Sequence, residues 1–243
     1  MAVGETINDG SVVWKKDFIM SLSKLPLAVG YNHKETFTSS GTFTAPITGL
    51  YKITLQGGGG GGCGSYVYRN IRFGGGGGGQ GGYLECYEHL TKNTSHSFVV
   101  GAGGSGSAGS NDVASYGTTG GATSIYINGN SYVCEGGEFG VNQNAQSRGG
   151  EGGAATINNT IINRGCCGHN GTALVGAWAV GGGGGEGADS GIGYGAIRGG
   201  GGQGGSYMSN GVAENGGTGG DGYITFEWFD PADVWPDLFP AQN

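Results

Sequence analysis

One segment of the chain combines cysteine with histidine, the residue types that bind soft metal ions. Gly165 to Gly171 reads GCCGHNG, so Cys166, Cys167 and His169 lie within four residues of one another. Adjacent cysteines fit a tetrahedral site poorly, and no second group of ligands accompanies them. We therefore expect a tight loop with buried or partly buried, reduced thiols, and we expect no metal ion and no cofactor.

Acidic residues are the next candidates for chemistry. Glu135 and Glu138, like Glu186 and Asp189, are loop acids, but a glycosidase needs two carboxylates facing each other across a cleft, and nothing marks such a pair. The motif GxGxxG arises by chance in a chain with 61 glycines, and GxxxxGK[ST] is absent. We therefore expect neither enzymatic activity nor nucleotide binding.

Segments that contain aromatic residues and arginine separate the runs of glycine in the sequence. Ser65 to Phe73 lies between two six-glycine runs, and similar inserts span 139–148, 189–198 and 207–215. Tyrosine and arginine provide contact area and directed hydrogen bonds at low entropic cost, as recognition surfaces require. The alternative, that these aromatics pack internally at the ends of the runs, stays open. The candidate receptor-binding residues are Tyr66, Tyr68, Arg69, Arg72, Phe139, Arg148, Tyr194, Arg198 and Tyr207.

The composition defines the scaffold that must position these inserts. Glycine supplies 61 of 243 residues and charged residues 12 %, yet hydrophobic residues reach 36 % and aromatic residues 10 %, enough for a core. The 5 prolines and the clustering of the glycines exclude collagen. The many aromatic residues argue against a disordered linker.

Short alternating segments predict β-strands. Gly49 to Gln56 places Tyr51, Ile53 and Leu55 on one face, and Gly222 to Phe229 repeats the pattern with Ile224, Phe226 and Trp228. Thr123 to Cys134 carries Asn128-Gly129 between two such runs, which is typical of a hairpin. We predict an all-β fold, a jelly-roll-like β-sandwich. Weaker strand candidates are 35–43, 83–90, 95–100 and 173–180, and 17–25 is a candidate short helix.

Runs of glycine lie between these strands. A glycine run loses much backbone entropy on ordering, so it stays disordered unless its N–H and C=O groups find partners. Several extended helices of the polyglycine II type, with three residues per turn, supply those partners to one another when packed side by side. The alternative is that the runs are flexible spacers. The runs are 57–62, 74–79, 81–82, 149–153, 181–185, 199–205 and 216–222.

Charge and hydropathy exclude two kinds of partner. The formal net charge of -7 and the scattered basic residues argue against nucleic acid, and no segment is long and apolar enough for membrane insertion. No signal peptide is visible, so we expect synthesis in the cytoplasm. We divide the chain into an N-terminal linker with a short strand (1–33), a glycine-rich β domain (34–229) and an acidic, proline-containing tail (230–243).

The order of several motifs resembles a known family. The strings SSGTFTAPITGLYKITLQGGGGGG, GGGGGGQGGYLECYEHL, TTGGATSIYINGN and GGDGYITFEWF are similar to the glycine-rich C-terminal domains of bacteriophage and prophage tail-fibre, receptor-binding proteins, and GETINDGSVVWK resembles a repeat that precedes distal domains in such proteins. TFTAPITGLYKI is similar to complement-type and tumour-necrosis-factor-like jelly rolls, and animal receptor kinases carry a related glycine-rich module.

The resemblance implies a function. The chain is expected to form the tip of a tail fibre on the virion and to bind a bacterial surface glycan or outer protein through the inserts. It is expected to join upstream tail-fibre segments as a homotrimer, with Leu50, Tyr51 and Trp228 available to an interface. A structural cap that trimerises the fibre without touching a receptor is the alternative, and a depolymerase is a third.

Overall fold

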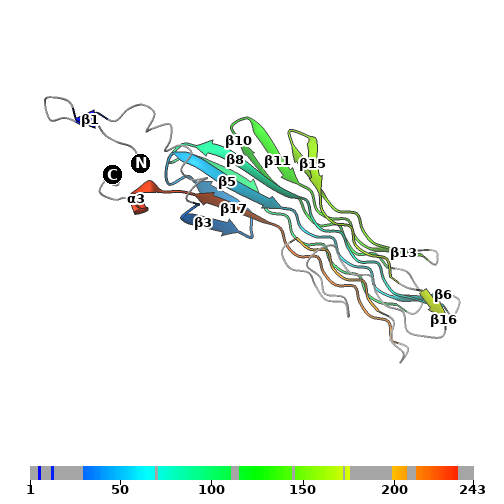
Figure 1. Ribbon diagram of the computed structural model, residues 1–243. Helices are drawn as coiled ribbons and strands as arrows, with labels where there is room; N and C mark the ends of the chain where they lie inside the picture. The colour runs from blue at the N-terminus through cyan, green and yellow to red at the C-terminus, as the bar shows by residue number, and fades with distance from the viewer. Residues whose placement is uncertain are drawn as a thin grey trace.

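The protein is elongated, as the computed structural model in Figure 1 shows. A β-sandwich lies at one end, and a bundle of glycine-rich rods, packed side by side, extends away from it. The start of β3 (His33–Phe37) and α3 (Pro231–Val234), joined by the contact of His33 with Asp233, lie on the side of the sandwich away from the rods. The structure describes residues 5–6, 12–13, 30–68, 71–110, 115–143, 146–171, 173–175, 199–206 and 212–234. Within these residues helix is confined to α3 (Pro231–Val234), and no helix is long and apolar enough to span a membrane.

The sandwich consists of two antiparallel sheets. The four-stranded sheet has the order β3-β17-β5-β8, and the six-stranded sheet has the order β15-β14-β11-β10-β9-β4. The chain passes from one sheet to the other between β3, β4 and β5 and again between β8 and β9, as in a jelly roll, so the predicted all-β sandwich is confirmed. The strands are β3 (His33–Phe37), β4 (Gly41–Thr44), β5 (Gly49–Gln56), β8 (Tyr83–Leu90), β9 (Ser95–Val99), β10 (Thr123–Ile127), β11 (Asn130–Cys134), β14 (Ala154–Ile157), β15 (Thr160–Arg164) and β17 (Tyr223–Trp228).

The sandwich core forms from the alternating residues that the sequence predicts. Tyr51, Ile53 and Leu55 of β5 are fully buried against β17 and the opposite sheet. Aromatic rings join the sheets: Phe43 stacks on Phe226 with ring centroids 4.0 Å apart. Because Tyr51 and Trp228 belong to this core, the expectation that they are available to a trimer interface is wrong.

The predicted hairpin forms, whereas the single strand predicted over 35–43 is divided in two. The hairpin β10–β11 turns at Asn128 and Gly129, whose φ angles of 51° and 86° are those of a tight two-residue turn. The single strand expected over 35–43 is two strands in different sheets, β3 and β4, because the bend at 38–40 directs the chain across the sandwich. The candidate helix over 17–25 lies outside the described residues.

The glycine runs of the described residues form an ordered lattice, as polyglycine II packing predicts, and the run 181–185 lies outside those residues. The central rod spans residues 57–65. Within 57–63 every third N–H group donates to the same neighbouring rod, which is the signature of three residues per turn. The C=O groups of this central rod accept hydrogen bonds from three further rods, so it has six neighbours. The donor–acceptor pairs, 2.8–2.9 Å apart, are Gly57–Gly82, Gly60–Gly79, Cys63–Gly76, Gly58–Gly121, Gly61–Thr118, Gly59–Gly220 and Gly62–Gly217.

Close approach of backbones explains why these positions are glycine. A Cβ on Gly59 would lie 1.8 Å from the carbonyl oxygen of Gly200, and a Cβ on Gly60 would lie 1.9 Å from that of Glu138. The φ angles of these two glycines are not in the left-handed region, so lack of space and not backbone conformation excludes a side chain.

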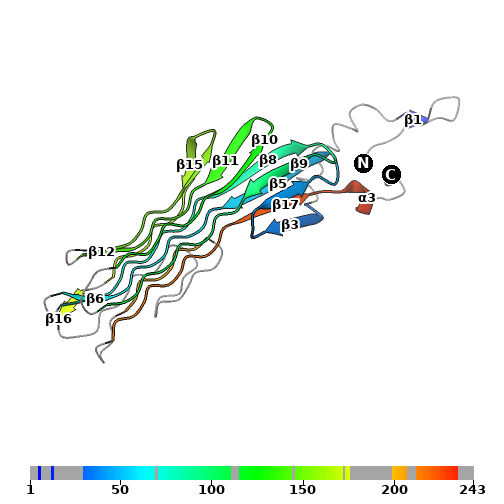
Figure 2. The ribbon, with the colours of Figure 1, turned by 180° about the vertical axis from the view of Figure 1, so that it is seen from behind.

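The rods are paired excursions of the chain from the sandwich (Figure 2). One rod leaves the end of a strand, and another returns, antiparallel, to the start of a later strand; β5, for example, continues outward and β8 receives the return. The outgoing rods are 57–65, 101–110, 135–140, 165–171 and 199–206, and the described returning rods are 74–82, 115–121, 149–153 and 212–222.

Short strands lie at the end of the lattice remote from the sandwich, which we call the far end. The hairpin of β6 (Tyr66–Tyr68) and β7 (Ile71–Phe73) lies here, with β16 (Ala173–Val175) paired to β7, and so does the hairpin of β12 (Val141–Gln143) and β13 (Gln146–Arg148) (Figure 1). The separate pair β1 (Glu5–Thr6) and β2 (Val12–Val13) belongs to the N-terminal region.

Candidate functional site

The far end carries the first two inserts that the sequence singled out, 65–73 and 139–148, whereas the insert 189–198 and residues 207–211 of the fourth insert lie outside the described residues. The first insert forms the β6–β7 hairpin, in which Tyr66 pairs with Phe73 and Val67 with Arg72. The second forms the β12–β13 hairpin, in which Val141 pairs with Arg148. Both hairpins turn the chain between an outgoing and a returning rod, and this explains why residues other than glycine occur there.

The candidate residues of the first insert have different surroundings. Tyr66 is only 4 % exposed, and its ring stacks on Phe73 with centroids 5.0 Å apart, so it packs internally. Arg72 is half-buried in β7. Tyr68 ends β6, and its side chain is outside the described part of the chain.

Candidates in the other inserts are described in part. Phe139 is half-buried and closely precedes β12, and Arg148, the last residue of β13, is exposed. Arg148 donates to the carboxylate of Glu151 at 3.0 Å. Arg69, Tyr194, Arg198 and Tyr207 lie outside the described residues.

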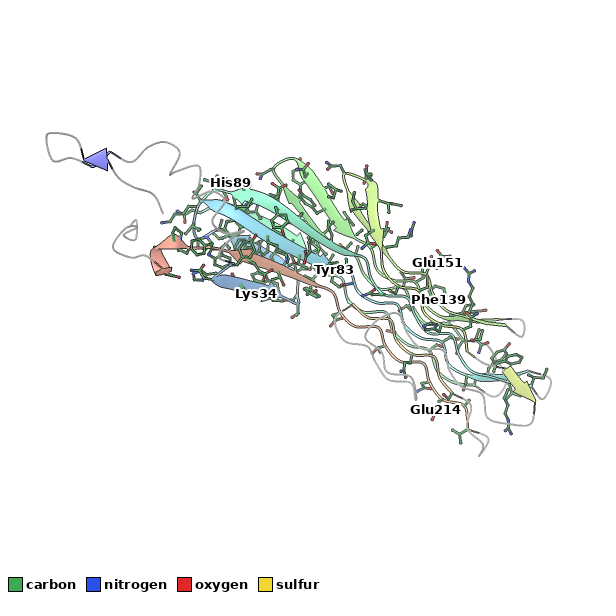
Figure 3. The ribbon with its side chains drawn as sticks, in the orientation of Figure 1. Lys34, Tyr83, His89, Phe139, Glu151 and Glu214 are labelled. Carbon is green, nitrogen blue, oxygen red and sulfur yellow. The ribbon has the colours of Figure 1, made fainter. Side chains whose placement is uncertain are left out.

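Tyr116, which sequence reasoning missed, forms an aromatic pair with the candidate Phe139 across two neighbouring rods. Tyr116, 44 % exposed, lies edge-on to Phe139 with ring centroids 6.3 Å apart. The rod of Tyr116 is bonded to that of Phe139 through Gly120 and Gly137, and the rod of Phe139 is bonded to that of Glu151. Figure 3 shows Phe139 and Glu151 near one another on one edge of the lattice, with Glu214 on the opposite edge. Aromatic and charged side chains therefore lie on adjacent rods.

A three-residue glycine period could have revealed Tyr116. Gly117 and Gly120 face the central rod, where a Cβ would lie 2.5 Å and 2.2 Å from carbonyl oxygens. The residues between such glycines point outward, and Tyr116 directly precedes one of them.

The same period corrects the interpretation of GCCGHNG. Gly165, Gly168 and Gly171 face the rod 74–82, and Gln80 and Gly77 donate to the C=O groups of Cys166 and His169. The segment is thus an extended rod and not a tight loop, and Cys166 and Cys167 are exposed where we expected buried or partly buried thiols.

The other three cysteines are buried free thiols. Burial raises the pKa of Cys63 to about 11 and those of Cys86 and Cys134 to about 12. Because the thiolate is the reactive species, these residues are poor nucleophiles and serve packing.

One group of potential metal ligands converges in the described part of the chain, at the sandwich end. Ligand atoms of His33, Asp230 and Asp233 lie within 4.8 Å of one another. His33 also stacks on Trp228, and Asn32 exchanges two hydrogen bonds with the backbone of Asp230. These contacts join residues just before the first domain boundary expected from the sequence to residues just after the second, and they hold the start of β3 against α3.

A buried carboxylate network supports the sandwich. Glu88 accepts hydrogen bonds from Tyr132, Asn128 and Asn130. Burial favours its protonated form, but these hydrogen bonds outweigh that effect and lower the pKa of Glu88. Glu88 is therefore an anion that joins β8 to the β10–β11 hairpin.

Comparison with known proteins agrees with this architecture. The family model described as "Glycine-rich domain" matches residues 37–229, from the end of β3 to just beyond β17. No curated protein matches the chain significantly. The match covers the sandwich and the lattice together, so the chain belongs to the glycine-rich domain family.

Proposed function

We propose that this chain is the tip domain of a phage or prophage tail fibre and that the far end of its lattice binds a bacterial surface glycan or outer protein. The observation that carries the proposal is the arrangement of the two ends of the elongated molecule. The start of β3 and α3 lie on the side of the sandwich away from the rods, whereas the hairpins β6–β7 and β12–β13 lie at the opposite end of the molecule (Figure 1). Upstream fibre segments would join at the sandwich and leave the far end free to meet a cell.

The lattice suits the presentation of a binding surface. Its rods are joined by backbone hydrogen bonds along their whole length, so side chains on neighbouring rods keep fixed separations. Tyr116 and Phe139 supply apolar ring surface of the kind that packs on the C–H face of a sugar, and Arg148 and Glu151 supply polar groups beside them. Binding then requires little ordering of the protein, which favours affinity.

Adsorption to cells tests the proposal. We expect saturable binding of fluorescently labelled protein to a susceptible strain within a panel of bacteria, abolished by either protease or periodate treatment of the cells. The double variant Tyr116→Ala, Phe139→Ala should bind at least tenfold more weakly. The matched control is Tyr87→Ala, because Tyr87 is 51 % exposed but lies on the sandwich.

Three results would contradict the proposal. Binding that is unchanged in the double variant, with an unchanged melting temperature, would move the site away from this aromatic pair. Failure to bind any strain of a broad panel would favour the structural cap. Release of oligosaccharide from capsule or lipopolysaccharide would instead identify a depolymerase.

A further inference from the structure

The two sheets of the sandwich present very different outer faces. On the four-stranded sheet, charged side chains form a ladder across neighbouring strands. Glu227 accepts from Lys34 at 3.4 Å and lies 3.8 Å from Lys52, and Lys52 also reaches Glu85 at 2.8 Å. Such a face is well satisfied in water and has no need of a partner.

The outer face of the six-stranded sheet carries no charge from β4 to β14. The registers place hydroxyl side chains such as Ser97, Ser124 and Ser131 at outward positions, alternating with the buried core residues. Apolar side chains stand among them: Val99 is 53 % exposed and Tyr126 is 66 % exposed. Contiguous uncharged surface with exposed aromatic and aliphatic groups marks an interaction site.

This face carries both a hollow and an exposed aromatic side chain. A hollow of about 300 Å³ lies between β9, β10 and β11, lined by Ser97, Ser124, Ser131 and Val133. Tyr126 stands at its edge and is the most exposed large apolar side chain of the described residues. A protruding aromatic ring beside a hollow provides the anchor and the pocket that a contact between two copies of one surface requires.

We propose that the chain self-associates through the outer face of β9, β10 and β11, with Tyr126 of one copy entering the hollow of another. Charge favours a second copy as the occupant. The chain has a net charge of -7, so most of its surfaces repel a second copy, whereas this face brings no like charges together. Hydroxyl groups both donate and accept, so they satisfy one another across the contact. The proposal is independent of receptor binding, and the contact, lying on the sandwich, leaves the far end free.

Sedimentation equilibrium of the full chain tests this contact. The wild type is expected to associate reversibly in the micromolar range, with the measured mass giving the number of copies. Tyr126→Arg and, separately, Ser97→Arg should each weaken association at least tenfold, because they bury an unpaired positive charge. Tyr87→Arg on the charged sheet is the matched control and should associate like the wild type.

Each outcome decides the proposal. A wild type that stays monomeric throughout this range overturns it, as does association that Tyr87→Arg weakens but Tyr126→Arg and Ser97→Arg do not. Since both test positions are exposed, the arginine variants should keep the wild-type melting temperature. If Tyr126→Arg alone fails to fold, Ser97→Arg decides between the outcomes.

Discussion

In the sandwich Phe43 and Phe226 fill the space between two sheets with their rings, whereas in the lattice Gly60 leaves no space for a single methyl group. The sandwich is stabilised mainly by apolar surface removed from water. The lattice buries almost no side chains along its central rod, and its backbone N–H and C=O groups bond the six neighbours. The same chain is thus stabilised in two ways. The sandwich depends on the volume of its apolar side chains, and the lattice depends on backbone hydrogen bonds that only residues without a side chain allow.

This difference predicts opposite responses to a change of volume. Gly60→Ala adds one carbon, which would lie 1.9 Å from the carbonyl oxygen of Glu138 and must push two rods apart. We expect a loss of about 4 kcal/mol or more in the free energy of unfolding, from overpacking together with broken hydrogen bonds. Denaturation in guanidinium chloride measures it.

The control for that variant is Gly49→Ala in the sandwich. There a Cβ would meet only the Cδ1 of Ile47, at 3.7 Å, which is an ordinary contact. We expect no loss, and a gain of up to about 1 kcal/mol from reduced entropy of the unfolded chain. Equal losses at the two positions would refute the contrast between the regions.

A change of side-chain shape in the sandwich core should lower the free energy of unfolding less than an added methyl group in the lattice does. Phe226→Leu removes aromatic volume from the fully buried centre of the core, and we expect a cost of about 1–2 kcal/mol because neighbouring side chains repack. The same denaturation experiment compares it with Gly60→Ala. A larger loss for Phe226→Leu would reverse the ranking.

Acid should weaken the sandwich through Glu88. The pKa of this carboxyl is lower in the folded protein than its ordinary value of 4.5, so its contribution is complete above that value and is lost as the pH falls through the folded-state pKa. Glu88→Gln should lose about 1–2 kcal/mol at pH 7 and converge with the wild type in acid. Melting curves at pH 7 and below pH 4 measure this, and a constant difference would exclude Glu88 as the titrating group.

The smallest effect is expected on the charged outer face. Lys52→Met removes the centre of the ion-pair ladder, where the hydrogen bond to Glu85 raises the pKa of Lys52. We expect a loss of at most about 1 kcal/mol at low salt, shrinking as salt is added. A loss that does not depend on salt would mean that Lys52 acts through packing.

The sandwich was largely predictable because its strands alternate with a period of two. Tyr51, Ile53 and Leu55 lie where that period places them. The separation of β3 from β4 was not predicted. Alternation within residues 35–43 indicates extended backbone, but it does not indicate that the chain crosses to the other sheet at 38–40. The two-residue period does not reveal which sheet has a charged outer face and which has an uncharged one, because that depends on which strands become neighbours.

The lattice was predictable in kind but not in its side-chain placement. Clustered glycine indicated packed polyglycine II rods, yet the two-residue alternation used for strands does not tell which intervening residues point outward. A three-residue period places Tyr116 and Cys166 on the surface. Tyr66, which the sequence offered as a contact residue, packs on Phe73 because hairpin pairing brings the two together, and no local pattern reveals that.

Amide hydrogen exchange followed by NMR tests most directly whether the glycine runs form a backbone-bonded lattice. We predict that the amides of residues 57–63, each bonded to a neighbouring rod, exchange as slowly as those of β5 and β17 in the sandwich core. Exchange of these glycine amides at the rate of an unstructured peptide, with β5 still protected, would contradict the lattice and leave the runs as flexible spacers.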